Sequence, residues 1–297
     1  MQISGYNALV PIRLIALDLD GTLLDNHHQI SPANSATIAE AFARGVEIVI
    51  VTGRRFDFAR PAVDSLDCNF HMIVSNGALI KSKDGATIQR HLLSAATAFR
   101  VLDATADFRS GISLIFDRPR EKQVILERVD WDHPVRGPYL RRNREFIAEI
   151  SPLASALNGD DPVQVGYAGS CASARALMAL LESLPFANEF TLALTEYLAR
   201  DLSILDVLAP TVSKGAALTE WARRRGVPRD AIMAIGDNFN DCEMLAAAGL
   251  PVVMGNAVAE LKAFGYPVTA TNNDSGVAAA IRKYALTGPA ARPEGVK

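Results

Sequence analysis

Two aspartates capable of shared chemistry stand at the end of a short apolar run. In the stretch "IRLIALDLDGTLLDN", Asp18 and Asp20 are two residues apart, directly before Gly21. Side chains alternate along a strand, so two carboxylates with this spacing can project into one site. Their repulsion would raise a pKa unless a cation lay between them. The pair therefore predicts a metal site.

A second acidic segment strengthens this prediction. The stretch "GDNFND" offers Asp237 and Asp241 after a later apolar run. Magnesium prefers hard oxygen ligands, supplied by a few carboxylates together with water and substrate phosphate. The two acidic segments together indicate a Mg²⁺ site of the kind that serves phosphoryl chemistry.

Phosphoryl transfer also needs fixed donors and cations, because its transition state spreads negative charge over three oxygens. Thr52 offers a hydroxyl and, with Gly53, closely approaching backbone N–H groups, while Lys214 offers a compact positive charge near a helix start. Asp18 could attack phosphorus as a carboxylate nucleophile. Asp20 could protonate the leaving oxygen and then deprotonate the attacking water.

An alternation of strands and helices must position these residues. Ser31 as a cap, Pro32 in the first turn and Gly45 as a stop predict a helix, and the apolar runs over 46–51 and 71–74 predict buried strands. Strand and helix in this rhythm indicate a parallel sheet whose ligands bind at the carboxyl ends of the strands. The polar clusters DLDGT, TGR and SNG all follow such strands, so we expect one shared site.

The middle of the chain has a different pattern of secondary-structure signals. It has longer connections and the short strand candidates "GISLIF", "PVQVGY" and "EFTLAL". We expect an inserted α+β domain over residues 81–202. The alternation of strands and helices resumes with "SILDVL", so residues 1–80 and 203–297 are expected to form one discontinuous core. The tail from residue 287 has the composition of a disordered segment.

The order of DLDGT, TGR, the lysine of SKG and GDNFND resembles the haloacid dehalogenase superfamily of phosphohydrolases. The segment SNGA, the late insertion and the endings "VVMGNAVAELK" and "NNDSGVA" more narrowly resemble the Cof-type subgroup. This resemblance implies an α/β fold: a Rossmann-like, doubly wound parallel sheet with an α/β cap inserted between the second and third motifs. It also implies a Mg²⁺-dependent phosphatase acting on a sugar phosphate or a phosphorylated cofactor.

The resemblance further implies roles for the acidic residues. Asp18 would be the nucleophile and Asp20 the acid/base, with the Asp20 main-chain carbonyl also on the metal. Asp237 would be a direct metal ligand, and Asp241 would complete the metal shell.

Phosphate contacts and site lining follow from the same resemblance. Thr52, Gly53 and Lys214 would bind the transferring phosphoryl group, and Asn240 would complete the phosphate shell. Three further positions are expected to line the site: Gly21, Arg54 and Asn76.

Composition limits the function classes. The 297 residues are 49% apolar, and 30 basic residues nearly balance 33 acidic ones, which suits one or two globular domains and argues against a nucleic-acid binder. Cys68, Cys171 and Cys242 show neither a disulfide framework nor zinc-ligand spacing. Neither a membrane-spanning run nor a cleavable signal is apparent, so we expect a cytoplasmic protein with a small phosphorylated metabolite as its partner. Monomer and homodimer both stay open.

Two other functions compete with hydrolysis. A phosphomutase of the same superfamily would carry the same motifs, and phosphate release without a bisphosphate activator would separate the two. A non-catalytic phosphoacceptor, such as a signalling receiver, or a sugar-phosphate binding module fits less well. A receiver places its acceptor after the third strand, and a binder has no use for Asp20.

Overall fold

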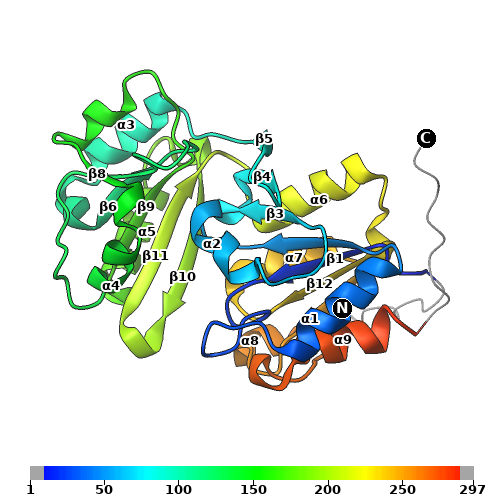
Figure 1. Cartoon of the computed structure of the whole chain (residues 1–297). Coiled ribbons are helices and arrows are strands. Elements are labelled where there is room, and N and C mark those ends of the chain that lie inside the picture. Colours follow the sequence, from blue (N-terminus) through cyan, green and yellow to red (C-terminus); the bar gives the residue numbers. More distant parts are fainter. Residues whose placement is uncertain (1–9, 288–297) are drawn as a thin grey trace. The chain divides into compact units, whose positions relative to one another are not determined.

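The apolar runs that precede the polar motifs form neighbouring strands of one sheet (Figure 1). In the computed structural model, which describes residues 10–287, its strands are β1 (Leu14–Asp18), β2 (Glu47–Val51), β3 (His71–Val74), β4 (Leu79–Ser82), β5 (Thr87–Arg90), β12 (Ile232–Gly236) and β13 (Leu250–Val253). They lie in the order β13-β12-β1-β2-β3-β4-β5, with the first five parallel and β4 antiparallel to β3. The carboxyl ends of β12, β1 and β2 are therefore adjacent.

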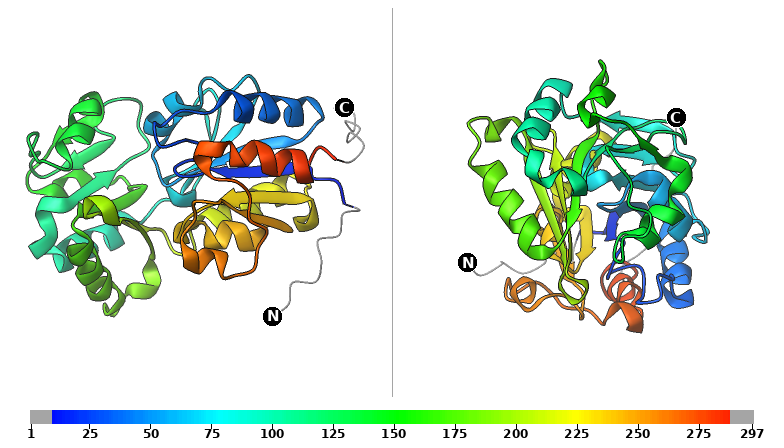
Figure 2. Two further views of the ribbon diagram at one scale, coloured as in Figure 1. Left: turned by 90° about the horizontal axis from the view of Figure 1, so that it is seen from below. Right: turned by 90° about the vertical axis from the view of Figure 1, so that its left-hand side faces the viewer.

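Helices cover both faces of this core sheet. They are α1 (Pro32–Ala43), α2 (Phe56–Val63), α6 (Lys214–Arg225), α7 (Cys242–Ala247), α8 (Ala259–Lys262) and α9 (Gly276–Tyr284). Leu14 and Ala16 of β1 pack in one cluster with Trp221 of α6, whereas the alternate residues Ile15 and Leu17 are fully buried against the other face. There α1 and α9 lie side by side (Figure 2). This doubly wound arrangement confirms the predicted fold class.

Local signals set the helix ends as the sequence predicts. The Ser31 hydroxyl accepts a hydrogen bond from the Asn34 N–H, and Pro32 opens α1. Ser213 caps α6 in the same way, which makes Lys214 the first residue of that helix. Gly226 ends α6 at a φ of 66°, in the left-handed region that glycine adopts without strain. The N-cap residue Ser213 thus fixes the position of Lys214 at the start of the helix.

The remaining strands form a second sheet in a separate compact unit, residues 90–212. They are β6 (Ile112–Ile115), β7 (Val124–Leu126), β8 (Ile147–Glu149), β9 (Gln164–Gly169), β10 (Thr191–Tyr197) and β11 (Leu202–Leu208). The order is β10-β11-β9-β6-β7-β8, antiparallel except for β7 and β8. Its helices are α3 (Ala95–Ala104), α4 (Gly137–Arg142) and α5 (Cys171–Glu182). This α+β cap unit has its own apolar core.

Both borders of the cap lie further along the chain than expected. The segment 81–89 belongs to the core, because β4 pairs with β3 and β5 follows as the edge strand of the core sheet. The segment "SILDVL", expected as a returning core strand, is β11 and pairs with β9 and β10 inside the cap. The return to the core comes at Ser213, immediately before α6.

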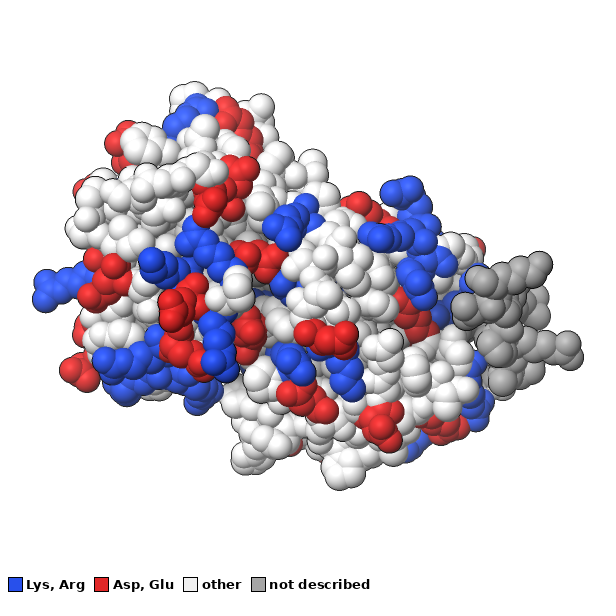
Figure 3. Space-filling view, turned by 45° about the horizontal axis from the view of Figure 1, so that its top comes forward, with Lys and Arg blue, Asp and Glu red and all other residues white. Residues whose placement is uncertain are grey.

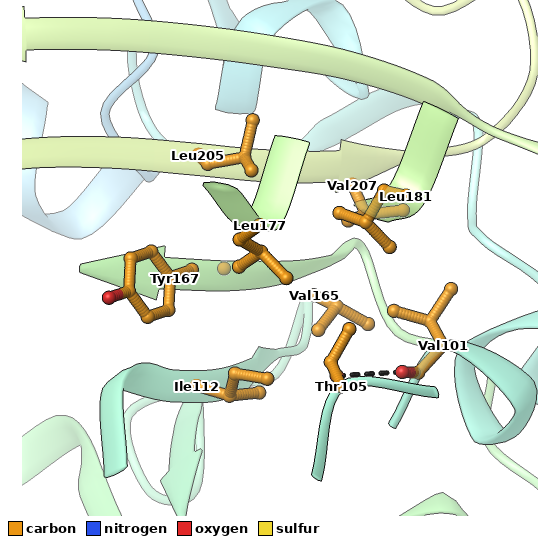
Figure 4. A pocket seen from close by; sticks show the side chains of 10 residues that line it. Val101, Thr105, Ile112, Val165, Tyr167, Leu177, Leu181, Leu205 and Val207 are labelled. Carbon is orange, nitrogen blue, oxygen red and sulfur yellow. Dashed lines mark hydrogen bonds between the residues drawn. The ribbon is translucent and has the colours of Figure 1, made fainter. Parts of the chain in front are cut away.

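A small apolar cavity of about 10 Å³ lies inside the cap, between its sheet and its helices (Figure 4). Val101, Ile112, Val165 and Leu177 are among its lining side chains, and the Thr105 hydroxyl turns away to the Val101 carbonyl. A space of this size lined by apolar groups is a packing defect rather than a ligand site.

The surface agrees with the balanced composition. On the face drawn in Figure 3, acidic and basic side chains are interspersed over the described residues. Between residues 10 and 287, no helix is both long and apolar enough to cross a bilayer. Residues 288–297, for which the composition predicts disorder, lie outside the described part of the chain.

Candidate active site

The predicted motifs meet at the carboxyl edge of the core sheet. Asp18 is the last residue of β1 and lies opposite Val51 of β2, which directly precedes Thr52. On the other side of β1, Leu17 pairs with Ile235 of β12, so Asp237 follows just beyond the same edge. Segments more than 180 residues apart in the sequence thus form one site.

A buried ion triad forms the centre of the site. The Lys214 Nζ lies 2.6 Å from Asp18 Oδ1 and 2.7 Å from Asp241 Oδ1. All three residues are buried. Alternation along β1 explains the contact, because Asp18 continues the series of Leu14 and Ala16 that faces α6 and α7.

Burial and charge shift the pKa values of this triad. Burial raises the pKa of Asp18 well above its usual range, and repulsion from Asp241 adds to the rise while Lys214 opposes it. For Lys214, burial lowers the pKa, but attraction to Asp18 and Asp241 outweighs it and the net shift is upward. Lys214 therefore stays protonated as the local counter-charge.

Asp237 completes an acidic cluster with Asp18 and Asp241. Each contributes an oxygen, and these three oxygens lie within 4.8 Å of one another. Asp237 Oδ1 accepts a hydrogen bond of 2.7 Å from the Thr22 hydroxyl. Three carboxylates against one lysine leave an excess of negative charge, and hard oxygen donors of this kind suit a magnesium ion. The donor set therefore fits a divalent cation.

Asp241 also holds the loop that carries Asp237. Its Oδ2 accepts hydrogen bonds from the backbone N–H groups of Asp237 and Asn238, at 3.0 and 3.1 Å. Asn240 lies immediately before it on the short helix η8 (Phe239–Asp241). A buried carboxylate bonded to two amides and a lysine orients its neighbours as well as adding charge.

Gly21 permits the close approach of the two acidic segments. Its φ is 77°, and a Cβ placed there would lie 2.4 Å from Asp237 Oδ2. Any side chain would therefore push Asp237 away. The glycine of DLDGT is thus required by space as well as by backbone conformation.

Asp20 does not join the acidic cluster through its side chain. Its carboxylate forms a two-pronged ion pair with Arg54: Nε donates to Oδ2 at 2.8 Å, and Nη2 donates to Oδ1. The guanidinium also lies over the Phe58 ring, 4.8 Å from its centroid. This geometry holds the Asp20 carboxylate in one orientation, paired with Arg54.

The TGR and SNG loops are hydrogen-bonded to each other next to β1. The Thr52 hydroxyl accepts from the Arg54 N–H at 3.1 Å, and the Thr52 carbonyl accepts from the Asn76 N–H at 3.2 Å. A Cβ on Gly53 would lie 2.9 Å from Asn76 Oδ1, so the Asn76 side chain covers this glycine. Thr52 is buried. The roles expected for these residues stay predictions: phosphate contacts for Thr52 and Gly53, and site lining for Arg54 and Asn76.

Sequence reasoning missed two contacts. The Thr22 hydroxyl bonded to Asp237 belongs to the quoted motif DLDGT, but spacing gives no sign of its partner. Arg54 was expected only to line the site, whereas it pairs with Asp20. The sequence signal for a contact of Arg54 within the site was its position two residues after Thr52, at the end of a strand.

The raised pKa values predict a stability that depends on pH and metal. Burial, with repulsion from Asp241, raises the pKa of Asp237 to about 7. At a pH between the pKa that this carboxyl has in the unfolded chain and its raised value in the fold, the folded state binds more protons than the unfolded state. Stability therefore falls as pH rises through 7. We expect the free energy of unfolding in EDTA to drop by roughly 2 kcal/mol between pH 5.5 and 8, and saturating Mg²⁺ to restore it.

Urea unfolding at both pH values, with EDTA or Mg²⁺, measures this. Asp237→Asn is the matched control, since it removes one of the two carboxyls with a raised pKa and should reduce the pH slope and weaken the Mg²⁺ response. A wild-type stability in EDTA that rises from pH 5.5 to 8 would contradict the expectation.

The chain is similar to known phosphatases along most of its length. A family described as haloacid dehalogenase-like hydrolase matches residues 15–281. The Streptococcus pyogenes protein M6_Spy0533 is 32% identical over 93% of this chain and 99% of its own length. The Bacillus subtilis 5-amino-6-(5-phospho-D-ribitylamino)uracil phosphatase YcsE is 29% identical over 93% of this chain and 97% of its own.

A solved structure agrees with these sequence matches. A haloacid dehalogenase-like hydrolase from B. subtilis superposes with a TM-score of 0.76 at 25% identity, covering 92% of this chain and 99% of its own. The predicted resemblance and the predicted enzyme class, a phosphatase, are therefore confirmed. The chain belongs to the family of haloacid dehalogenase-like hydrolases.

Proposed function

We propose that this chain is a Mg²⁺-dependent phosphatase that hydrolyses a small phosphorylated metabolite through an aspartyl-phosphate on Asp18. The observation that carries the proposal is the Asp18–Lys214–Asp241 triad, with Asp237 beside it at the end of β1. A buried carboxylate with a lysine on one oxygen presents the other oxygen as a nucleophile.

In the first step, the free oxygen of the Asp18 carboxylate forms a bond to phosphorus while the bond from phosphorus to the leaving oxygen breaks. Asp20, in its protonated form, gives its proton to that leaving oxygen. The Thr52 hydroxyl, the Gly53 N–H and the Lys214 ammonium group meet the negative charge on the phosphoryl oxygens. The products are the free alcohol and an acyl phosphate on Asp18.

In the second step, water attacks phosphorus and the acyl phosphate bond breaks, which restores the Asp18 carboxylate. Asp20 is now ionised and takes the proton from the attacking water. The two-pronged contact with Arg54 fixes the direction of the Asp20 carboxylate.

Asp18, Asp237 and Asp241 would hold the metal, with the main-chain carbonyl of Asp20. When bound, Mg²⁺ supplies positive charge that offsets the negative charge of the carboxylates and of the substrate phosphate. Lys214 alone cannot offset both.

The substrate is proposed as a sugar phosphate or a phosphorylated cofactor. YcsE, which this chain resembles over nearly its full length, is by name a phosphatase of a phosphorylated ribitylamino compound. The residues of the core site would meet the phosphoryl group and its leaving oxygen, so they do not by themselves select among these substrates.

Phosphate release from a panel of sugar phosphates and phosphorylated cofactors tests the proposal. We expect Mg²⁺-dependent release from at least one compound, and loss of that release in EDTA. Isomerisation of a sugar phosphate that requires a bisphosphate activator would instead identify a phosphomutase. A folded protein that binds phosphate esters without turning any of them over would favour a binding module.

A further inference from the structure

Two sequence motifs have no part in the chemistry described so far. The segment "VVMGNA" begins within β13 and runs past its end, and "NNDSGVA" leads into α9. In the structure they meet through Asn256 and Asn272: the Asn272 N–H donates to Asn256 Oδ1 at 2.8 Å. Both asparagines then turn their amide groups toward the loop that carries Asp20.

Asn256 bonds to the residue that directly follows the acid/base. Its Nδ2 donates to the Gly21 carbonyl at 2.8 Å. Gly21 has no Cβ and a φ of 77°, so its backbone is intrinsically less constrained than that of its neighbours, and the bond from Asn256 restrains its carbonyl. On its other side, Thr22 is fixed to Asp237.

Asn272 bonds further along the same loop. Its Nδ2 donates to the Leu24 carbonyl at 3.0 Å, and its side chain is buried. Leu24 in turn donates its N–H to the Leu19 carbonyl at 2.9 Å, closing the turn around Asp20. The two asparagines therefore hold the turn 19–24 at two of its carbonyls.

We infer that Asn256 is a positioning residue for acid catalysis by Asp20, acting through the Gly21 carbonyl. The inference rests on the proposed function. Arg54 fixes the carboxylate of Asp20 from the side-chain end, and Asn256 fixes the backbone that carries it. Loss of the Asn256 donor lets the Gly21 peptide rotate and displaces the proton donor from the leaving oxygen, while Asp18, at the end of β1, keeps its place in the sheet.

This role makes a prediction that a purely structural role does not. A displaced acid slows only the reaction whose leaving group needs a proton. Expulsion of an alkoxide from a sugar phosphate needs one, whereas expulsion of p-nitrophenolate scarcely does. For Asn256→Ala we expect kcat/KM to fall roughly 10- to 100-fold on an alkyl phosphate and by less than about 3-fold on p-nitrophenyl phosphate.

Two further variants separate the donor from the rest of the side chain. Asn256→Asp keeps an oxygen to accept from Asn272 but has no donor for Gly21, so it should behave as Asn256→Ala does. Asn69→Ala removes another exposed asparagine, at the opposite end of the core sheet before β3, and should match the wild type. Equal losses on both substrates, or an Asn256→Asp variant with wild-type rates, would overturn the inference.

Hydrogen exchange provides a readout that does not need activity. The amides of Leu23 and Leu24 are bonded within the turn, and in Asn256→Ala they should exchange at least about fivefold faster, with the core strands unchanged. Unchanged exchange in this turn would overturn the inference whatever the kinetics. A wild-type protein that hydrolyses neither substrate would count against the proposed function, and the exchange result would still decide whether Asn256 holds the loop.

Discussion

Asp18→Asn should lower phosphate release by at least about 10⁴-fold while leaving the fold intact. An amide is a far weaker nucleophile than a carboxylate, so no acyl phosphate forms. The charge of Asp18 is unfavourable to folding, because burial and Asp241 both raise its pKa. Its removal should therefore leave the unfolding midpoint in EDTA unchanged or higher, since Lys214 still has Asp241 as a partner.

Steady-state phosphate release and urea unfolding measure the two halves of this prediction. Asp230→Asn is a matched control: Asp230 is exposed and precedes β12, at the end of the sheet away from the site. A variant at Asp18 that keeps more than a few per cent of wild-type turnover would remove this residue from the nucleophilic role.

Lys214→Met should abolish turnover and also destabilise the protein. The substitution leaves Asp18 and Asp241 buried beside each other without their counter-charge, and breaking a buried ion pair on one side typically costs about 3–5 kcal/mol. Part of this cost will be relieved by proton uptake, so the loss in EDTA should grow as pH rises.

A double variant tests the physical reason. Adding Asp18→Asn to Lys214→Met removes one of the two stranded carboxylates and should recover at least about half of the lost stability without recovering activity. Lys283→Met, on the exposed end of α9, serves as the control for loss of a lysine. If Lys214→Met unfolds at the wild-type urea concentration in EDTA at pH 8, Lys214 does not stabilise the fold as the counter-charge of Asp18 and Asp241.

Much of the core was predictable because its signals are local. The helix N-cap at Ser31 predicts the start of a helix, and the apolar runs followed by polar clusters predict strands that end at one shared edge. The structure has these elements there. The side of the sheet on which Asp18 lies also follows from its parity with Leu14 and Ala16.

The cap borders were harder because strand pairing is not a local property. "SILDVL" is apolar enough for a core strand, yet its pairing with β9 depends on residues about 40 positions earlier. Its composition does not reveal this pairing, because the polar Ser203 and Asp206 are both buried within β11. A signal was available at the other border, where Asp84 and Gly85 mark the turn between β4 and β5.

The candidate site was predictable in its residue types and less so in its contacts. Spacing can place Asp18, Asp20 and Asp237 near one edge, but it does not reveal that Asp20 pairs with Arg54 rather than joining the acidic cluster. The link from Asn256 to Gly21 spans 235 positions, and only the folded chain brings the two together.

The most direct test of an aspartyl-phosphate on Asp18 is to look for this covalent intermediate. A substrate identified by phosphate release, carrying ³²P in its phosphoryl group, is mixed with the Mg²⁺-loaded enzyme and quenched in acid during turnover. We expect acid-stable, base-labile label on the peptide that contains Asp18, and none in Asp18→Asn. Rapid turnover with no label on the protein, or label on another residue, would contradict a mechanism through an aspartyl-phosphate on Asp18.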